Sequence, residues 1–307
     1  MNARIGWPAM VVGVMYLFAL AYGLLAPTLG ALAVGGIPVV REHRAYLPVV
    51  VAVPSWLSAT SVPRPTATAT LADLRTVLRP GTEGALKAAL LVPGALVLPV
   101  AGEYRPCCPL RIAAGVTLDG RGAVRLIGEG LIIYRANGVT VRDLSIVDAD
   151  GDGIGVNESM NVILEKLDIG GWGDGGIDIV RTPIGGAPHL IRDVVLHDGK
   201  KGNLDGHQWE PVDDGARILL ERVTFRNVWV RTPKVHRMSV TMVDCLIVNW
   251  SGPALDVQLG GSVNMIRTRW EAGPDSLRTY YTPTGGTVTE FGTVWIPFRR
   301  QQRIGEL

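Results

Sequence analysis

The sequence predicts an all-β protein built as a right-handed parallel β-helix, a solenoid whose coils stack along one axis. Three observations support this prediction: an eight-residue strand pattern that recurs along the chain, 38 glycines and 20 prolines among 307 residues, and a hydrophobic content of 47%. Only 19% of the residues are charged, which excludes a disordered, charge-rich chain. The net charge is +2, so composition predicts no nucleic-acid partner. Three cysteines, with Cys107 and Cys108 adjacent, exclude a disulfide framework.

The first 36 residues are predicted to be a signal peptide or a membrane anchor. The stretch from Pro8 to Gly36 carries no charged residue and is long enough to cross, or nearly cross, a hydrocarbon core about 30 Å thick. The small residues of Ala31-Leu32-Ala33 fit a signal-peptide cleavage site. An uncleaved segment would instead attach the protein to a membrane through residues 8–33. We therefore expect a secreted or periplasmic protein, or a membrane-anchored one if the segment is retained.

Residues 37–69 are predicted to form a linker rich in proline, serine and threonine, and residues 70–307 to form the β-helix domain. At the start of this domain Thr70 and Asp73 have the spacing of a helix capping box. The pattern predicts a short helix that runs through about Leu78 and caps the open end of the β-helix.

Apolar residues occupy the first, third, sixth and eighth places of the recurring eight-residue pattern. Alternation within each half predicts two short strands, and the two-residue skip between the third and sixth places predicts a bend. Successive copies start 22–29 residues apart, which is typical of solenoid coils whose strands stack about 4.8 Å apart. The copies start at Val116, Val139, Val162, His189, Ile218, Val240 and Val263.

Charged residues follow the eighth place at nearly the same phase in four successive coils. Because stacked coils bring equal phases together, we expect these side chains along one groove that spans roughly 15 Å. Four carboxylates without histidine or cysteine suit a hard cation bound through oxygen, so Ca²⁺ is favoured over Zn²⁺. A lysine and an arginine beside the cation would suit an anionic substrate. The residues are Asp150 and Asp152, Asp174 and Asp178, Lys201, and Arg231.

Several segments between residues 70 and 250 resemble the calcium-dependent pectate lyases, a family of parallel β-helix polysaccharide lyases (polysaccharide lyase family 1). Two of these segments are similar to buried strand motifs of that family, and the other four to its calcium, lysine and arginine motifs. They are Gly115-Val-Thr-Leu-Asp-Gly-Arg-Gly122, Asn137-Gly-Val-Thr-Val-Arg-Asp-Leu144, Asp150-Gly-Asp152-Gly-Ile, Asp174-Gly-Gly-Ile-Asp178-Ile, Lys200-Lys201-Gly-Asn-Leu-Asp-Gly206 and Arg231-Thr-Pro233.

The resemblance implies a pectin lyase-like solenoid that cleaves polygalacturonate by β-elimination and leaves 4,5-unsaturated products. It implies that Arg231 removes the C5 proton and that Lys201 holds the uronate carboxylate as charge develops on it. The second arginine of the family motif falls on His236, with Arg237 one place later, and both are expected to bind substrate. The implied cofactor is Ca²⁺, held by Asp150, Asp152, Asp174 and Asp178. The expected partner is an acidic polysaccharide such as pectate, and the expected state is a monomer.

Three alternatives stay open. A β-helix glycoside hydrolase would use a carboxylate pair such as Asp213-Asp214. A non-catalytic β-helix that binds polysaccharide or serves at a surface is favoured by His236 in place of the arginine. A pectin lyase, acting on methylated substrate, would lack the calcium carboxylates that are present here.

Overall fold

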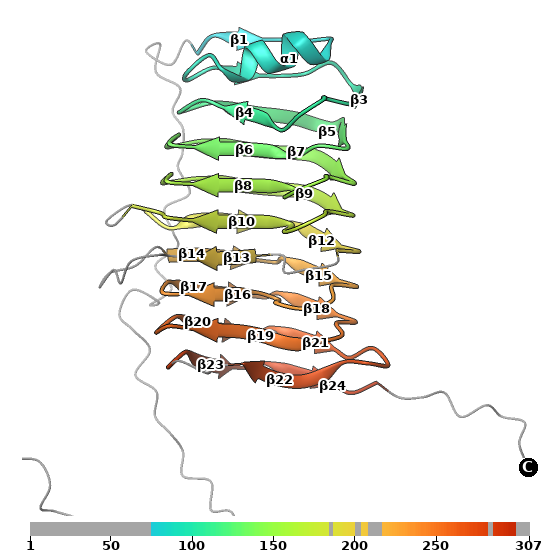
Figure 1. Cartoon of the computed structure of the whole chain (residues 1–307), viewed down its shortest axis with the longest axis vertical. Helices are drawn as coiled ribbons and strands as arrows, with labels where there is room; N and C mark the ends of the chain where they lie inside the picture. Colours follow the sequence, from blue (N-terminus) through green and yellow to red (C-terminus); the bar gives the residue numbers. More distant parts are fainter. Residues whose placement is uncertain (1–74, 184–186, 200–203, 208–216, 282–284, 299–307) are drawn as a thin grey trace, which may run out of the picture. The chain divides into compact units, whose positions relative to one another are not determined.

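The computed structural model describes residues 75–183, 187–199, 204–207, 217–281 and 285–298. These residues form a parallel β-solenoid of about eight coils, which confirms the predicted fold class (Figure 1). Every strand pair among them is parallel, and strands pair across coils rather than along the chain. The predicted leader at 1–36 and linker at 37–69 lie outside the described residues. Within the described part of the chain, no helix is both long enough and apolar enough to span a membrane.

Three faces make up each coil, and the predicted eight-residue pattern supplies two of them. In the coils that start at Val116, Val139 and Val162, a single long strand runs through both faces; later coils divide it into two strands. The long strands are β5 (Thr117–Ile127), β7 (Thr140–Val147) and β9 (Ile163–Gly170). The divided strands are β11 (His189–Arg192), β12 (Val195–His197), β14 (Arg217–Glu221), β15 (Thr224–Arg226), β17 (Ser239–Val243), β18 (Leu246–Val248), β20 (Ser262–Ile266), β21 (Arg269–Glu271), β23 (Thr287–Phe291) and β24 (Val294–Ile296).

The third face is a separate sheet of eight strands, one from each coil, and the eight-residue pattern does not predict these strands. Most of these strands have only three or four residues, of which two point inward, so their alternation is too short to stand out. They are β4 (Leu110–Ile112), β6 (Leu131–Tyr134), β8 (Ile154–Asn157), β10 (Ile177–Val180), β13 (Leu204–His207), β16 (Lys234–His236), β19 (Pro253–Gln258) and β22 (Leu277–Tyr281).

The core consists of the columns that the repeat predicted. In the six copies that start from Val139 to Val263, every residue at the first, third, sixth and eighth places is at most 3% exposed, His189 and Thr268 included. Successive members of a column pair in register, as Val141 does with Leu164 and Ile146 with Ile169. Each coil therefore buries its apolar face against its two neighbours.

The bend between the two halves of the pattern is made by the residue at the fifth place. In all six copies this residue is charged and adopts a left-handed backbone conformation, with φ between 51° and 53°. A residue with a Cβ atom adopts this conformation at a cost of roughly 1 kcal/mol. The residues are Asp143, Lys166, Asp193, Arg222, Asp244 and Arg267.

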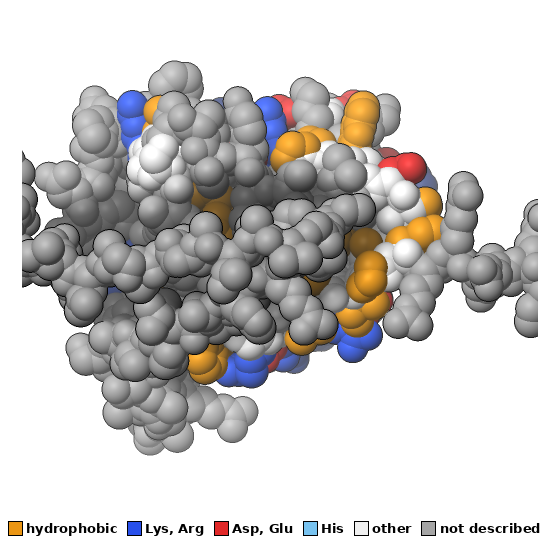
Figure 2. All heavy atoms as spheres, turned by 90° about the horizontal axis from the view of Figure 1, so that it is seen from below, with side chains coloured by type: hydrophobic (Ala, Val, Ile, Leu, Met, Phe, Trp, Pro, Cys, Tyr) orange, Lys and Arg blue, Asp and Glu red, His pale blue; other side chains and the backbone are white. Residues whose placement is uncertain are grey.

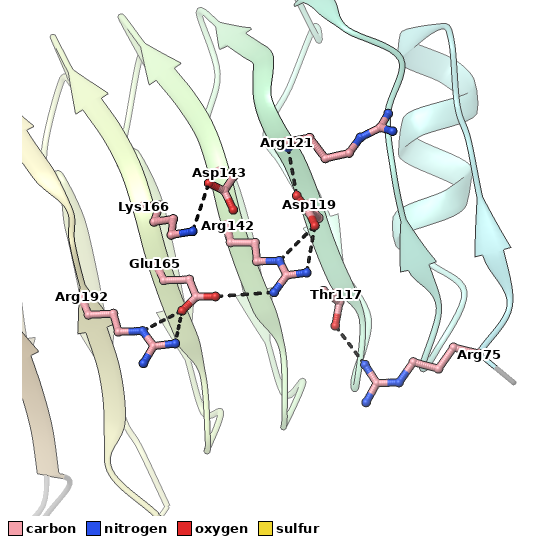
Figure 3. A network of polar contacts seen from close by, with 9 residues as sticks. All are labelled: Arg75, Thr117, Asp119, Arg121, Arg142, Asp143, Glu165, Lys166 and Arg192. Carbon is pink, nitrogen blue, oxygen red and sulfur yellow. Dashed lines mark hydrogen bonds and ion pairs between the residues drawn. The ribbon is translucent and has the colours of Figure 1, made fainter. Parts of the chain in front are cut away.

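Side chains at the fourth and fifth places form ion pairs from coil to coil, and we call this set the charge ladder (Figure 3). Arg142 lies between two acids, with a nitrogen 2.9 Å from Asp119 Oδ2 and another 3.7 Å from Glu165 Oε1. Glu165 in turn pairs with Arg192. At the fifth place the pairs are Asp143 with Lys166, Asp193 with Arg222, and Asp244 with Arg267.

The capping helix is present, but it lies later in the chain than predicted. Val77 and Leu78, expected to end the helix, instead form strand β1 (Val77–Leu78), which pairs with β2 (Leu96–Val97). The helix α1 (Glu83–Leu90) begins after Thr82, whose Oγ1 accepts a hydrogen bond from the Ala85 amide. The helix predicted from the capping box at residues 70–73 is therefore wrong for residues 77–78, which form a strand. Residues 70–73 themselves lie outside the described residues.

The two ends of the solenoid differ. At the first coil, α1 buries Leu86 and Leu90 against the core beside β3 (Gly102–Tyr104) and β4. At the last coil, apolar side chains reach the surface, as Figure 2 shows from that end. They include Phe291 at 69% exposure, Val294 and Phe298.

Candidate functional site

Two aspartate-rich turns stack on each other at the edge of the third face. The turn after β7 carries Asp150 and Asp152, and the turn after β9 carries Asp174. Backbone hydrogen bonds join the two turns, from Asp174 N to Gly151 O at 3.1 Å and from Gly153 N to Gly175 O at 2.8 Å. The predicted register thus brings these two segments to adjacent coils.

Each of the four aspartates lies opposite a glycine of the neighbouring coil. Asp178 pairs with Gly155 across β10 and β8, and the Gly175 amide donates to Asp152 Oδ1 at 2.9 Å. Asp174 bonds to Gly151, and a Cβ atom added to Gly173 would lie 1.9 Å from the carbonyl oxygen of Asp150. The backbones of the two turns approach closely at Gly173, whereas nothing lies within 4 Å of the place where a Cβ atom of Gly151 would stand.

Asp152 and Asp178 share one patch of the third face. Asp152 Oδ2 lies 3.6 Å from the point where a Cβ atom of Gly155 would stand, and Gly155 is the register partner of Asp178. Both carboxylates are half-buried, whereas Asp150 and Asp174 are exposed on the turns. The structure therefore separates the four predicted ligands into an inner pair and an outer pair.

The predicted convergence of all four carboxylates on one cation is not found as a preformed cluster. Among the described residues, no group of three or more histidine, cysteine, aspartate or glutamate side chains is placed to hold a metal ion. The physical reason is the register, which sets Asp174 opposite Gly151 rather than opposite an aspartate. The inner pair still offers only carboxylate oxygens, the donors that a hard cation such as Ca²⁺ prefers.

A line of charged residues continues from Asp178 along the outer side of the third face, and we call it the site row. Its members are one coil apart in register, so that neighbours lie about 4.8 Å apart. Sequence reasoning missed three of them, although adding the coil spacings of 27, 29 and 22 residues to position 178 would have found each one. The row consists of Asp178, Asp205, Lys234 and Asp256, with Asp205 placed by its backbone, and Gly155 is the register partner that precedes Asp178.

Arg231 lies beside the far end of the site row, just before the cis peptide bond between Thr232 and Pro233. Its Nε is 3.7 Å from Asp256 Oδ2, and Asp256 Oδ1 accepts a hydrogen bond of 2.5 Å from Gln258. Asp256 is only 7% exposed, so the guanidinium is held by a carboxylate that is itself fixed. Nearby Trp229 is 59% exposed and offers an aromatic surface to solvent.

The remaining predicted residues differ in how accessible they are. His236 ends β16 and is 7% exposed, whereas Arg237, which follows it with φ of 54°, is half-buried. Arg237 is therefore better placed than His236 to contact a ligand. Lys201 and the pair Asp213-Asp214 lie outside the described residues.

Sequence comparison relates the chain to pectate lyases. Over 163 residues it is 31% identical to pectate lyase plyB of Emericella nidulans, and over 161 residues 30% identical to a probable pectate lyase B of Aspergillus terreus. The first match covers 49% of this chain and 49% of the relative, and the second covers 48% and 49%. The chain thus spans about half the length of these curated relatives. No protein-family model matches.

Structure comparison supports the same fold. A Bacillus subtilis pectate lyase matches with a TM-score of 0.61 at 14% identity, over 76% of this chain and 83% of that one. The cedar pollen allergen jun a 1 matches with a TM-score of 0.58 at 16% identity, over 75% and 82% of the two chains. A Bacillus pectate lyase in complex with trigalacturonate gives 0.55 at 14% identity, over 74% and 84%. At such identities the likeness shows a shared β-solenoid.

Proposed function

We propose that this relative of the pectate lyases is itself a polysaccharide lyase that cleaves polygalacturonate by calcium-assisted β-elimination. The observation that carries the proposal is the placement on one solenoid face of the inner pair, Asp152 and Asp178, with Arg231 farther along the same face. The spacing between β10 and β16 is about 10 Å, two coils, which the long arginine side chain partly spans. A polyanion lying along this face would meet carboxylates first and cations after them.

The inner pair would hold the calcium ion, with Asp150 and Asp174 reaching in from the turns. When bound, Ca²⁺ would neutralise a uronate carboxylate and acidify the proton on the adjacent carbon. No atom lies within 3.5 Å of the places where Cβ atoms of Gly151 and Gly155 would stand, which supports room for a ligand beside these two glycines. We propose that Lys201 completes the neutralisation of the same carboxylate.

Arg231 would accept the proton from C5 of the sugar. Asp256 fixes the Nε edge of the guanidinium, which orients the side chain along the site row. Trp229 would stack on a sugar ring, and Arg237 and Lys234 would bind the carboxylates of neighbouring sugars. The bond to the leaving oxygen at C4 then breaks and leaves a 4,5-unsaturated end.

The test is to mix the purified full chain with polygalacturonate, in Ca²⁺ or in EDTA, and to follow the ultraviolet absorbance of the unsaturated product. We expect growth of the absorbance that requires calcium and disappears in Arg231→Ala. Arg222→Ala, which changes an arginine of the charge ladder, is the matched control and should keep the activity. A flat trace from folded protein across several acidic polysaccharides would refute the lyase. New reducing ends without absorbance, insensitive to EDTA, would indicate a hydrolase.

A second candidate function is polyuronate binding without turnover. The burial of His236 favours it, because a side chain that is 7% exposed cannot replace the reach of an arginine toward substrate. Tight binding of polygalacturonate to the wild-type chain, with no product in the assay above, would establish this function instead.

A further inference from the structure

Two adjacent cysteines lie between β3 and β4, far from the charged end of the site row. Cys107 is exposed and Cys108 is half-exposed, in a bend bounded by Pro106 and Pro109. Their sulfur atoms are 3.6 Å apart. Cys245, by contrast, is 1% exposed and lies in a core column, where solutes in solution cannot reach it.

The surroundings of the pair are built from the capping helix. Lys87 of α1 places its Nζ 3.9 Å from Cys108 Sγ. The backbone amide of Arg105 donates to Glu83 Oε1 at 2.7 Å, which ties the segment before the cysteines to the start of α1. A cavity of about 290 Å³, lined among others by Lys87, Cys108 and Arg111, opens beside the sulfurs. The pair is thus accessible, held in place and next to a positive charge, the conditions under which thiols react.

We propose that Cys107 and Cys108 form a redox modification site that reacts with low-molecular-weight disulfides and closes to a reversible disulfide between the adjacent residues. The thiolate of Cys107, the more exposed sulfur, attacks a disulfide of the glutathione class. A mixed disulfide forms and one glutathione thiolate leaves. The thiolate of Cys108 then attacks Cys107 Sγ, and the second glutathione leaves. The protein loses two hydrogens and is oxidised, while one oxidised glutathione is reduced to two thiols.

The order of the two steps follows from the contacts. Cys107 is the more exposed of the two sulfurs and reacts first, whereas the hydrogen bond with Cys107 and the negative charge of that neighbour raise the pKa of Cys108. Once Cys107 is in the mixed disulfide, its charge is gone and Lys87 remains to stabilise the Cys108 thiolate. Lys87 therefore serves the closing step.

The product is expected to be easy to reduce. Cα atoms of adjacent residues are about 3.8 Å apart, shorter than the roughly 4.4–6.8 Å usual for disulfides. Strained and exposed disulfides have the more oxidising potentials and are the labile ones. The site would then follow the redox state around the protein rather than serve as a fixed cross-link.

The test is intact-protein and peptide mass spectrometry of the reduced full chain after treatment with oxidised glutathione. We expect the loss of two hydrogens, localised to the peptide with residues 107 and 108, and full reversal by reduced glutathione. Cys107→Ser and Cys108→Ser should each stop at a single glutathione adduct, because no second thiol is available. Lys87→Gln should accumulate the mixed disulfide severalfold over wild type.

Cys245→Ser is the matched control and should behave as wild type. A wild-type protein that keeps one or two glutathione groups without closing would overturn the proposal, as would disulfide-linked dimers or a failure of both thiols to react in folded protein. Folding of each variant is checked by thermal unfolding under reducing conditions. None of these measurements depends on enzyme activity, so they test this proposal independently of the proposed function.

Discussion

The charge ladder and the site row both arise from the stacking of coils, but the order of charges along them differs. In the ladder each acid meets a base on the next coil, as Asp193 meets Arg222, and the signs alternate along the column. In the site row Asp178 is followed in register by Asp205, and Asp152 lies one coil before Asp178, so that acidic residues stand on successive coils. Stacking brings residues at the same phase of successive coils next to each other, so the order of their charges decides whether neighbours attract or repel. Alternating signs stabilise the stack, whereas like signs concentrate negative charge where a cation can bind.

The largest expected effect comes from neutralising one member of the inner pair. Asp178→Asn should reduce calcium-dependent activity on the order of 1,000-fold, the scale of loss when a charge-stabilising group is removed. In EDTA it should leave the unfolding temperature unchanged or higher, because like charges are relieved. Rate assays and thermal unfolding measure the two effects.

Asp193→Asn is the matched control from the charge ladder. It should lower stability and leave activity in place. If the two variants exchanged these behaviours, the distinction between ladder and row would be wrong.

Buried His189 gives the free energy of unfolding a pH dependence of its own, in addition to that of the charge ladder. Burial lowers the pKa of His189 to about 4 from its usual 6.5. Between these values the unfolded chain binds more protons, so stability should fall as pH falls, by up to about 3 kcal/mol at pH 4. Denaturant unfolding from pH 7 to pH 4 measures this loss.

His189→Val, which matches the residue at this place in other copies, should flatten that profile. The pH dependence of stability that comes from the charge ladder can then be measured by itself. Hydrogen bonds from arginines hold the pKa of Asp193 and Asp244 below the usual value, so their contribution is present above about pH 4 and lost below it. A slope between pH 4 and 6.5 that survives the substitution would contradict the role given to His189.

Within the ladder, Glu165 should matter most because it lies between Arg142 and Arg192 and is 8% exposed. Glu165→Ala leaves two guanidinium groups facing each other and should cost about 2 kcal/mol of unfolding free energy, between the values for surface and buried pairs. Glu103→Gln, which alters exposed pairs with Arg105 and Arg125, should cost almost nothing. Equal losses of unfolding free energy in the two variants would show that the position of Glu165 in the charge ladder adds no stability.

The smallest effect concerns the exchange of Asp193 and Arg222. Both residues already adopt φ of 53°, so the backbone accepts either side chain at either place. Each single reversal should lose about 1 kcal/mol, and the double exchange should recover the part that comes from this pair alone, because Lys166 and Asp244 then face like charges. A double-mutant cycle at low and high salt checks the coupling, which salt should weaken. A coupling energy of zero in this cycle would mean that local backbone preference, rather than pairing, selects these residues.

The repeat was predictable because its columns are both buried and regularly spaced, as Val141, Leu164 and Ile191 illustrate. The third face was not, since short strands such as β16 carry too little alternation to be detected. Lys234 and Asp256 could have been found by carrying the coil spacing forward from Asp178. The separation of Asp152 and Asp178 from Asp150 and Asp174 depends on turn geometry, which the spacing alone does not encode.

The uneven length of the coils has a consequence for how such a protein can change. Eight residues separate β10 from β11 and nine separate β13 from β14, whereas two separate β16 from β17. The added residues fall where the chain leaves the third face, next to Asp178 and Asp205, and the columns on either side keep their register. Insertions at these corners are modular: they lengthen one coil beside the third face without moving the core. If this face binds substrate as proposed, new specificities can arise there by lengthening one coil at a time.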